Sequence, residues 1–274
     1  MNREEGARWA DIARGAGLRD KLKILLHVLA RYRPGFWSLL HRLCGEKDRC
    51  ITVKTPCGPA RLVFNPLHTS ELTVVDELLS GDIYIARREA VELVDCGAFR
   101  GISTIYLQDQ VKAARVTAYE PQAENFAILA RRLGKYLPDA VCVNAAVGPE
   151  NSEVFFDGGG LGGSVGKVGF RVRMVRLRDE LSAADPSTLL VKMDIEGAEH
   201  EVLPDIFPVL PQDCSLFLET HFPLRPSEAV LEPFRREGFR VAECRRRQES
   251  DSDVLFIDWV LSRPDFGKPH SCAR

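Results

Sequence analysis

The residues most suited to chemistry gather in one short run, residues 192–201, which reads KMDIEGAEHE. Lys192 and Asp194 are two positions apart, so in a strand their side chains point to the same face of a sheet. Buried at a strand end, these two charges must be paired, because an unpaired buried charge is costly. Glu199 and Glu201 are typical of a first helical turn, where carboxylates complement the helix dipole. The run therefore predicts a strand that ends in charged groups and leads into a helix.

A second polar group, Glu219-Thr220-His221, follows another apolar run. Histidine readily accepts a proton near neutral pH, so His221 is a candidate general base. A histidine that is only hydrogen-bonded at a strand end is an equally good interpretation. On the catalytic interpretation Lys192, Asp194 and His221 face an acceptor molecule, and His221 or Asp194 removes its proton. The run Lys192-Asp194-Glu196 could also coordinate a divalent metal, but no matching ligand set is evident, and we expect no metal site.

A glycine-bearing turn, residues 95–101 (DCGAFRG), follows a third apolar run. Gly97 allows close approach of the backbone to a ligand, and Gly101 allows the next helix to pack on the strand. Phe99 holds the middle glycine position of the GxGxxG dinucleotide fingerprint, where it would crowd a pyrophosphate. The turn therefore disfavours a nicotinamide cofactor. Asp95, at the strand tip, suits a hydrogen bond to the cationic amino-acid end of a cofactor, directly or through water.

Two further polar residues, Glu120 and Asn144, stand at the ends of the next two apolar runs. An acidic residue placed like Glu120 accepts hydrogen bonds from ribose hydroxyls in nucleotide-binding sheets. Its alternative role is that of an acid favoured by a helix N-terminus. Asn144 suits recognition of an adenine edge, and a simple strand-end turn is the alternative.

These groups require strands to position them. Five short apolar runs read as strands: residues 92–95, 115–120, 140–144, 189–194 and 215–219. Short strands that alternate with helical segments at a spacing of about 25 residues indicate βαβ units and a parallel sheet. In such a sheet, ligands bind beyond the carboxyl ends of the strands, where the polar groups stand.

Two antiparallel hairpins are expected to flank this unit. Residues 51–54 and 61–64 surround a Pro/Gly turn, and a short helix is expected at 71–79. Near the other end of the chain, residues 239–244 and 254–261 are joined by a polar loop. An open α/β sheet finished by such a hairpin is the arrangement of class I methyltransferases.

A glycine-rich segment, residues 157–169, interrupts the alternation between two further predicted strands, 152–156 and 170–175. So many glycines cannot build a packed core, so we expect a mobile loop. It serves either as a flexible hairpin tip or as a lid on the acceptor side.

Together these residues resemble the FkbM family of S-adenosylmethionine-dependent methyltransferases. The matching pieces recur in order over about residues 50–262: residues 94–101, Tyr119-Glu120-Pro121 with Glu124-Asn125-Phe126, residues 144–148, residues 191–199 and Leu218-Glu219-Thr220-His221. The Lys-x-Asp-x-Glu-Gly-Ala-Glu run is the most specific of them. Phe99-Arg100 departs from the family, which usually has Asn followed by an aliphatic residue.

The resemblance implies an α/β, Rossmann-like class I methyltransferase fold, with S-adenosylmethionine as the cofactor. It implies transfer of a methyl group to a hydroxyl oxygen, often on a sugar or a secondary metabolite, so the expected partner is a small-molecule or glycan acceptor. The cofactor-binding residues would be Asp95, Gly97, Ala98, Gly101, Glu120 and Asn144.

The 274 residues suit one globular domain with terminal extensions. We expect an N-terminal helical extension or cap at 1–48, the methyltransferase domain at 49–264 and a tail at 265–274. Basic and apolar side chains in 22–43 could contact a membrane surface, although a helical cap is the main interpretation. Eight cysteines without CxxC pairs, and no secretory signal peptide, predict reduced thiols and a cytoplasmic protein.

Three other functions compete with this one. An NAD-dependent oxidoreductase would use a similar sheet, but Phe99 argues against it. A protein that kept the fold and lost catalysis would bind the cofactor without turnover. A nucleic-acid methyltransferase would rest on the arginines in 171–178 and 245–247, but the net charge of −2 gives no global basic field, and no nucleic acid is expected.

Overall fold

The structure is a computed structural model that describes residues 47–80, 84, 86, 90–157, 164–166, 168–184, 188–211, 213–222, 228–248 and 255–262. The expected N-terminal extension, apart from residues 47 and 48, and the expected tail at 265–274 lie outside the described residues. No helix within the described ranges is long and apolar enough to cross a membrane.

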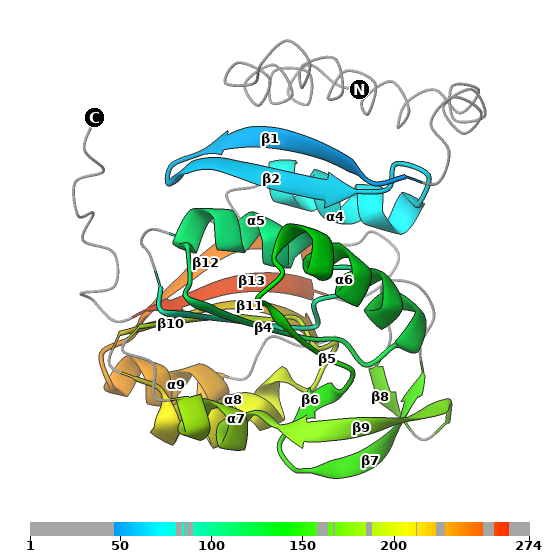
Figure 1. The fold of residues 1–274 in the computed structure, drawn as a ribbon. Helices are drawn as coiled ribbons and strands as arrows, with labels where there is room; N and C mark the ends of the chain where they lie inside the picture. Colours follow the sequence, from blue (N-terminus) through cyan, green and yellow to red (C-terminus); the bar gives the residue numbers. More distant parts are fainter. Residues whose placement is uncertain are drawn as a thin grey trace.

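A seven-stranded sheet forms the centre of the molecule, with strand order β12-β13-β11-β10-β3-β4-β5 (Figure 1). Its strands are β3 (Glu92–Cys96), β4 (Arg115–Tyr119), β5 (Val141–Val143), β10 (Leu189–Met193), β11 (Cys214–Phe222), β12 (Arg240–Gln248) and β13 (Leu255–Ser262). All neighbours from β5 to β11 pair in parallel, whereas β13 is antiparallel to both β11 and β12. This is the predicted Rossmann-like sheet, mostly parallel, with its C-terminal antiparallel hairpin.

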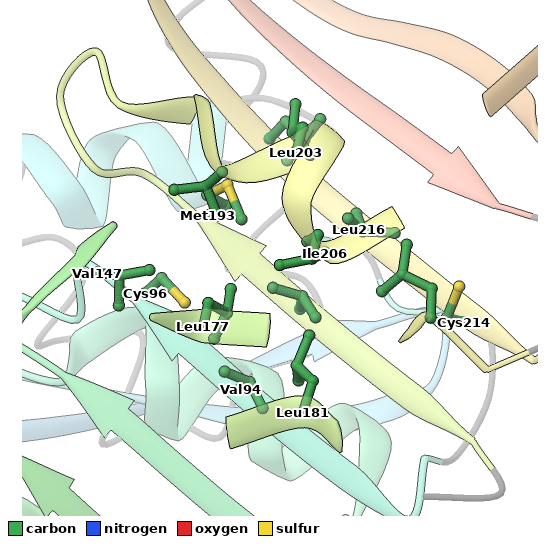
Figure 2. Packing of buried hydrophobic residues seen from close by; sticks show 14 of the residues in the cluster. Val94, Cys96, Val147, Leu177, Leu181, Met193, Leu203, Ile206, Cys214 and Leu216 are labelled. Carbon is green, nitrogen blue, oxygen red and sulfur yellow. The ribbon is translucent and has the colours of Figure 1, made fainter. Parts of the chain in front are cut away.

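Helices cover both faces of this sheet (Figure 1). On one side lie α4 (Thr69–Ser80), α5 (Ile102–Val111) and α6 (Ala123–Tyr136), and on the other α7 (Leu177–Ala184), α8 (Glu199–Ile206) and α9 (Glu228–Arg236). Side chains alternate between the two faces along each strand. Leu93 and Leu190 contact the first set of helices, while Val94 and Val191 contact the second. Figure 2 shows the second face, where Met193 and Leu216 meet Leu203 and Ile206.

The predicted N-terminal hairpin is present as β1 (Arg49–Thr55) and β2 (Gly58–Phe64), paired antiparallel. It lies over α5, on the side away from the central sheet (Figure 1). Its inward side chains, including Ile51 and Leu62, share a core with Ile102 and Tyr106 of α5. Helix α5 is therefore buried on nearly all sides, which explains why its apolar residues show no single hydrophobic face.

A second sheet, ordered β6-β9-β7-β8, follows β5. It contains β6 (Ala146–Gly148), β7 (Ser152–Asp157), β8 (Ser164–Gly166) and β9 (Phe170–Arg176), so the two predicted strands are confirmed. The predicted loop over 157–169 contains a short strand at 164–166, which pairs with β7. An edge strand presents backbone N–H and C=O groups that need hydrogen-bond partners. Despite the surrounding glycines, the short β8 provides such partners for β7.

The C-terminal hairpin is longer than predicted. Strand β12 continues to Gln248, with a shift in register between Glu243 and Arg245. Arg245, Arg246 and Arg247 therefore lie in a strand, whereas the sequence had suggested a polar loop.

Candidate cofactor and active site

The predicted site residues meet at one edge of the central sheet, because the strands that carry them are parallel and in register. Lys192 lies beside Asp95 of β3 on one side and beside Phe217 of β11 on the other. Asp95 in turn lies beside Ala118 of β4. The carboxyl ends of β4, β3, β10 and β11 therefore form one continuous rim, as expected for a nucleotide-binding sheet.

The turn after β3 lies directly on the end of β10. Gly97 has a φ of +77°, and a Cβ there would stand 1.8 Å from the Asp194 carbonyl oxygen. The N–H groups of Gly97 and Ala98 donate to the Tyr119 carbonyl, over 3.1 and 2.9 Å, and the Asp194 N–H donates to the Cys96 carbonyl. Glycine at 97 is therefore required by both its conformation and its surroundings.

Phe99, the next residue but one, has a φ of +51°, which is costly for an aromatic residue. Its N–H donates to Glu120 Oε2 over 2.9 Å. Gly101 begins α5 with a φ of +78°, and a Cβ there would stand 2.8 Å from Leu129 of α6. The sequence had suggested that Gly101 lets the helix pack on the strand, whereas the closest approach is between α5 and α6.

Asp95 has no exposed surface, so it differs from the expected ligand contact at the strand tip. Its Oδ2 accepts hydrogen bonds from the hydroxyls of Ser103 and Thr104, at 3.1 and 2.6 Å. The carboxylate thus ties β3 to the first turn of α5. Burial explains the difference, because the Asp95 carboxylate lies beneath the turn and contacts the hydroxyls of α5.

Lys192 is also buried, with its side chain 3% exposed, and it does not stand in front of the rim as we had expected. Its Nζ donates to the Gly97 carbonyl over 2.8 Å and lies 3.2 Å from Asp95 Oδ1 and 3.5 Å from Asp194 Oδ2. Burial opposes its charge, but the two carboxylates outweigh that effect and hold the pKa of Lys192 above the ordinary lysine value. Lys192 therefore supports the turn from behind as a permanent cation.

Glu120 closes the rim on the β4 side. Its two oxygens accept the Phe99 N–H and the Gln122 N–H, each over 2.9 Å. Burial raises the pKa of Glu120 to about 7, against the opposing effect of these hydrogen bonds. Each oxygen keeps lone-pair capacity for a hydroxyl donor. Ala98, the other residue expected near the cofactor, is buried with 1% exposure.

Asn144 is exposed at the end of β5. Its amide nitrogen donates to the carbonyls of Glu120 and Pro121, at 2.8 and 3.1 Å. The two alternatives for this residue are compatible: the nitrogen fixes the strand-end turn, and the amide oxygen is left as an acceptor.

The loop between β10 and α8 carries the other acids of the run. Glu199 is fully buried, and its carboxylate accepts the N–H groups of Ile195 and Gly197, at 3.0 and 2.9 Å. Glu196 between them has a φ of +57°. Glu199 therefore holds the loop closed, a role more specific than dipole compensation. Asp194, whose side chain is 26% exposed, reaches the rim surface.

The β11 end brings in a residue that the sequence did not reveal. The Tyr84 hydroxyl donates to Glu219 Oε2 over 3.1 Å, and its ring lies edge-on to Phe217 and 5.9 Å from Lys192 Nζ. No periodicity or motif marks Tyr84, so only the tertiary fold identifies it. The backbone of His221 pairs with Phe256 of β13, and its side chain lies outside the described part of the structure.

Among the residues that the structure describes, no group of three or more His, Cys, Asp or Glu side chains is placed to hold a metal ion. The site consists instead of a strained backbone turn, a buried lysine behind it, and the carboxylates of Glu120 and Asp194 on either side.

Comparison with known proteins gives only distant structural likenesses. No protein-family model and no curated protein matches this chain. PH0793 of Pyrococcus horikoshii, named as a transferase, is 13% identical over 85% of this chain and 84% of its own, with a TM-score of 0.47. TYW2 of M. jannaschii, in complex with AdoMet, is 13% identical over 79% of this chain and 88% of its own, with a TM-score of 0.42.

The 1,6-didemethyltoxoflavin-N1-methyltransferase of Burkholderia thailandensis, with bound S-adenosylhomocysteine, is 17% identical over 70% of this chain and 75% of its own, with a TM-score of 0.37. At such identities and TM-scores these proteins establish neither a family nor an activity. The strand order of the central sheet is the stronger evidence for the fold.

Proposed function

We propose that the chain is an S-adenosylmethionine-dependent methyltransferase whose cofactor lies across the carboxyl ends of β3 and β4. The observation that carries this proposal is the strand order β12-β13-β11-β10-β3-β4-β5 with β13 reversed. Sheets that bind dinucleotides have six strands in the order 3-2-1-4-5-6 without this inserted reversed strand. The reversed strand supports a methyltransferase over an oxidoreductase.

The residues at the rim fit this cofactor. Because Gly97 lacks a Cβ, the turn can lie directly against the end of β10, and Glu120 retains acceptor capacity for ribose hydroxyls. Asn144 would offer its amide oxygen to the adenine amine. When bound, S-adenosylmethionine supplies a methyl group already activated by a sulfonium, so the protein has to align the acceptor and remove its proton.

The acceptor side of the proposal is O-methylation of a hydroxyl on a sugar or secondary metabolite. Asp194 stands partly exposed at the end of β10, which supports it as the group that receives the hydroxyl proton. His221, two residues after Glu219 on β11, is the second candidate base. Lys192 is better suited to holding the turn than to touching an acceptor, since its Nζ is committed to Gly97 and Asp95.

Binding experiments test the cofactor half. In calorimetry, S-adenosylmethionine and S-adenosylhomocysteine should bind, and NAD should not. A ligand present at 100 times its Kd should raise the free energy of unfolding by about 2.7 kcal/mol. Binding of NAD alone would overturn the proposal. Binding without methyl transfer to any hydroxyl acceptor in a panel of sugars and polyketides would indicate a protein that kept the cofactor and lost this activity.

Variants test the base. With an acceptor in hand, Asp194→Asn and His221→Ala should be compared at saturating cofactor. Substitution of the residue that acts as the base should lower kcat by about 100-fold or more, because general base catalysis typically contributes that much. Unchanged turnover in either variant removes that residue from the mechanism.

A further inference from the structure

A buried ion network stands behind the cofactor turn, outside the residues that the proposed function uses. It contains two carboxylates, Asp48 and Glu71, and two guanidinium groups, Arg100 and Arg132. Arg132 Nη2 lies 2.7 Å from Asp48 Oδ1 and 2.8 Å from Glu71 Oε2, and Arg100 Nη1 lies 3.1 Å from Glu71 Oε1. The Arg132 and Glu71 side chains are 0% and 1% exposed. Two positive and two negative charges balance, as burial of ions requires.

The network is attached to the turn at the backbone of Arg100. Arg132 Nη1 donates to the Arg100 carbonyl over 2.7 Å. That carbonyl belongs to the residue next to Phe99, whose φ of +51° is strained. A buried guanidinium that is fixed by two carboxylates therefore holds the carbonyl in place and helps to maintain the strained conformation.

A second branch leads from the Arg100 side chain to the ribose-binding candidate. Arg100 Nε donates to Asn125 Oδ1 over 2.9 Å, and the Asn125 amide donates to Gln122 Oε1. The Gln122 N–H donates to Glu120 Oε1 over 2.9 Å. Since Glu120 also accepts the Phe99 N–H and Arg132 donates to the Arg100 carbonyl, hydrogen bonds hold the Phe99–Arg100 segment at both ends.

The N-terminal hairpin is also attached to α5 by an ion pair that is separate from the network around Arg132. Arg61 Nε and Nη2 lie 2.9 and 2.7 Å from the Asp109 carboxylate, and the Arg61 N–H donates to it over 2.6 Å. Asp109 stands near the C-terminal end of α5, away from the turn that precedes the helix. The Arg61–Asp109 ion pair thus joins two elements only, whereas the network around Arg132 also holds the turn.

We propose that Arg100 is a positioning residue for the cofactor, which acts by holding Phe99 and Glu120 in their binding geometry. Through Glu71 and Asp48, the α4 and hairpin region contributes to cofactor affinity without touching the cofactor. This inference rests on the proposed function, because it concerns binding of S-adenosylmethionine or its demethylated product at the same turn.

The test measures the Kd of S-adenosylhomocysteine by calorimetry at a temperature well below the melting point of every variant. Arg100→Met should raise the Kd by about tenfold, or about 1.4 kcal/mol. Arg100→Lys keeps the charge beside Glu71 but lacks the fork that serves Glu71 and Asn125 together, so it should restore only part of the affinity. Asp109→Asn is the matched control: it should lower the melting temperature and leave the Kd within twofold.

A charge-balanced variant guards against misfolding. Glu71→Gln together with Arg100→Met leaves Arg132 paired with Asp48, so no buried charge is left without a partner. This double variant should fold, by circular dichroism, and bind S-adenosylhomocysteine at least tenfold more weakly than the wild type.

The outcomes separate the two proposals. If the wild type binds neither cofactor form, the proposed function is wrong and this inference falls with it. If the wild type binds and Arg100→Met binds equally well, only the inference is wrong. Equal weakening in Arg100→Met and Asp109→Asn would also overturn it, because general loosening would then explain both effects.

Discussion

At the scale of single residues, backbone conformation distinguishes the site from the rest of the sheet. Phe99 and Glu196, like Tyr84 and Lys112, are non-glycine residues with φ above +50°, and they follow the neighbouring strands β3 and β10. Such conformations cost about 1–3 kcal/mol each and persist only where the surroundings enforce them. The enforcing groups are Glu120 for Phe99 and Glu199 for the loop around Glu196.

Gly97 provides the sharpest test at this scale. Gly97→Ala should lower the free energy of unfolding by more than about 2 kcal/mol, since the new Cβ meets the Asp194 carbonyl and the residue keeps a positive φ. Urea denaturation measures the change. Gly134→Ala, at an exposed site in α6 where a Cβ meets nothing within 4 Å, is the control and should stabilise the protein by about 0.5–1 kcal/mol. Equal effects in the two variants would contradict the close approach at Gly97.

Glu120 should make ligand affinity depend on pH. Because burial raises the pKa of Glu120 to about 7, the carboxyl loses its charge as the pH falls through neutrality. The ionised form is the better acceptor for ribose hydroxyls, so ligand binding should favour it and release a proton. Adenosine, which has the ribose but no amino-acid end, should therefore bind about tenfold more weakly at pH 6 than at pH 8.

Calorimetry in two buffers of different ionisation enthalpy detects the released proton directly. The Glu120→Ala variant should bind adenosine weakly and without this pH dependence. A wild-type affinity that stays constant from pH 6 to pH 8 would exclude a ribose contact by the ionised carboxylate.

At the scale of secondary-structure elements, the loop from β10 to α8 depends on one carboxylate. Glu199→Ala leaves the N–H groups of Ile195 and Gly197 without their acceptor and should lower the free energy of unfolding by about 2–4 kcal/mol. Hydrogen exchange at those two amides should accelerate. Glu201→Ala, at an exposed position in the same helical turn, should cost less than about 1 kcal/mol. A small effect at both positions would show that the loop is held by other contacts.

The strands could be predicted from the sequence because each is a short apolar run that ends at a polar residue. Packing on both faces produces that pattern directly, as in β10, where every residue is buried. Helix α5 gave a weaker signal, since the hairpin covers the side that would otherwise face water. Strand β8 was missed because glycines dominate its neighbourhood and its stability comes from pairing with β7.

The sequence predicted which residues come together at the site better than it predicted which way their side chains point. Lys192, Asp95 and Glu120 do meet at the rim, as strand spacing implied. Yet Asp95 and Lys192 serve the protein interior, because their partners Ser103, Thr104 and the Gly97 carbonyl come from other segments of the chain. Tertiary contacts of this kind leave no local pattern in a sequence.

At the scale of the whole molecule, the two faces of the sheet have different tasks. The face under α4, α5 and α6 carries the turn and its ion network, whereas the face under α7, α8 and α9 carries a large apolar cluster that includes Phe207, Phe234 and Phe239. Phe234 is fully buried and contacts both of the other rings. Phe234→Ala should therefore cost about 3–5 kcal/mol of unfolding free energy.

The same variant should leave the Kd for S-adenosylhomocysteine within about twofold, when it is measured where the protein is fully folded. Urea denaturation and calorimetry on one sample give both quantities. A large loss of affinity would show that the two faces are coupled through the sheet.

The ion network has a consequence for where this domain begins. By its strands, the central parallel sheet starts with β3 at Glu92. By its charges it starts at Asp48, because Arg132 inside α6 is neutralised partly by that residue and partly by Glu71. A fragment or a chimera cut at the sheet boundary would keep every strand of the central sheet and leave Arg100 and Arg132 without their counter-ions. For this fold, the electrostatic boundary is the one that a recombinant exchange of segments has to respect.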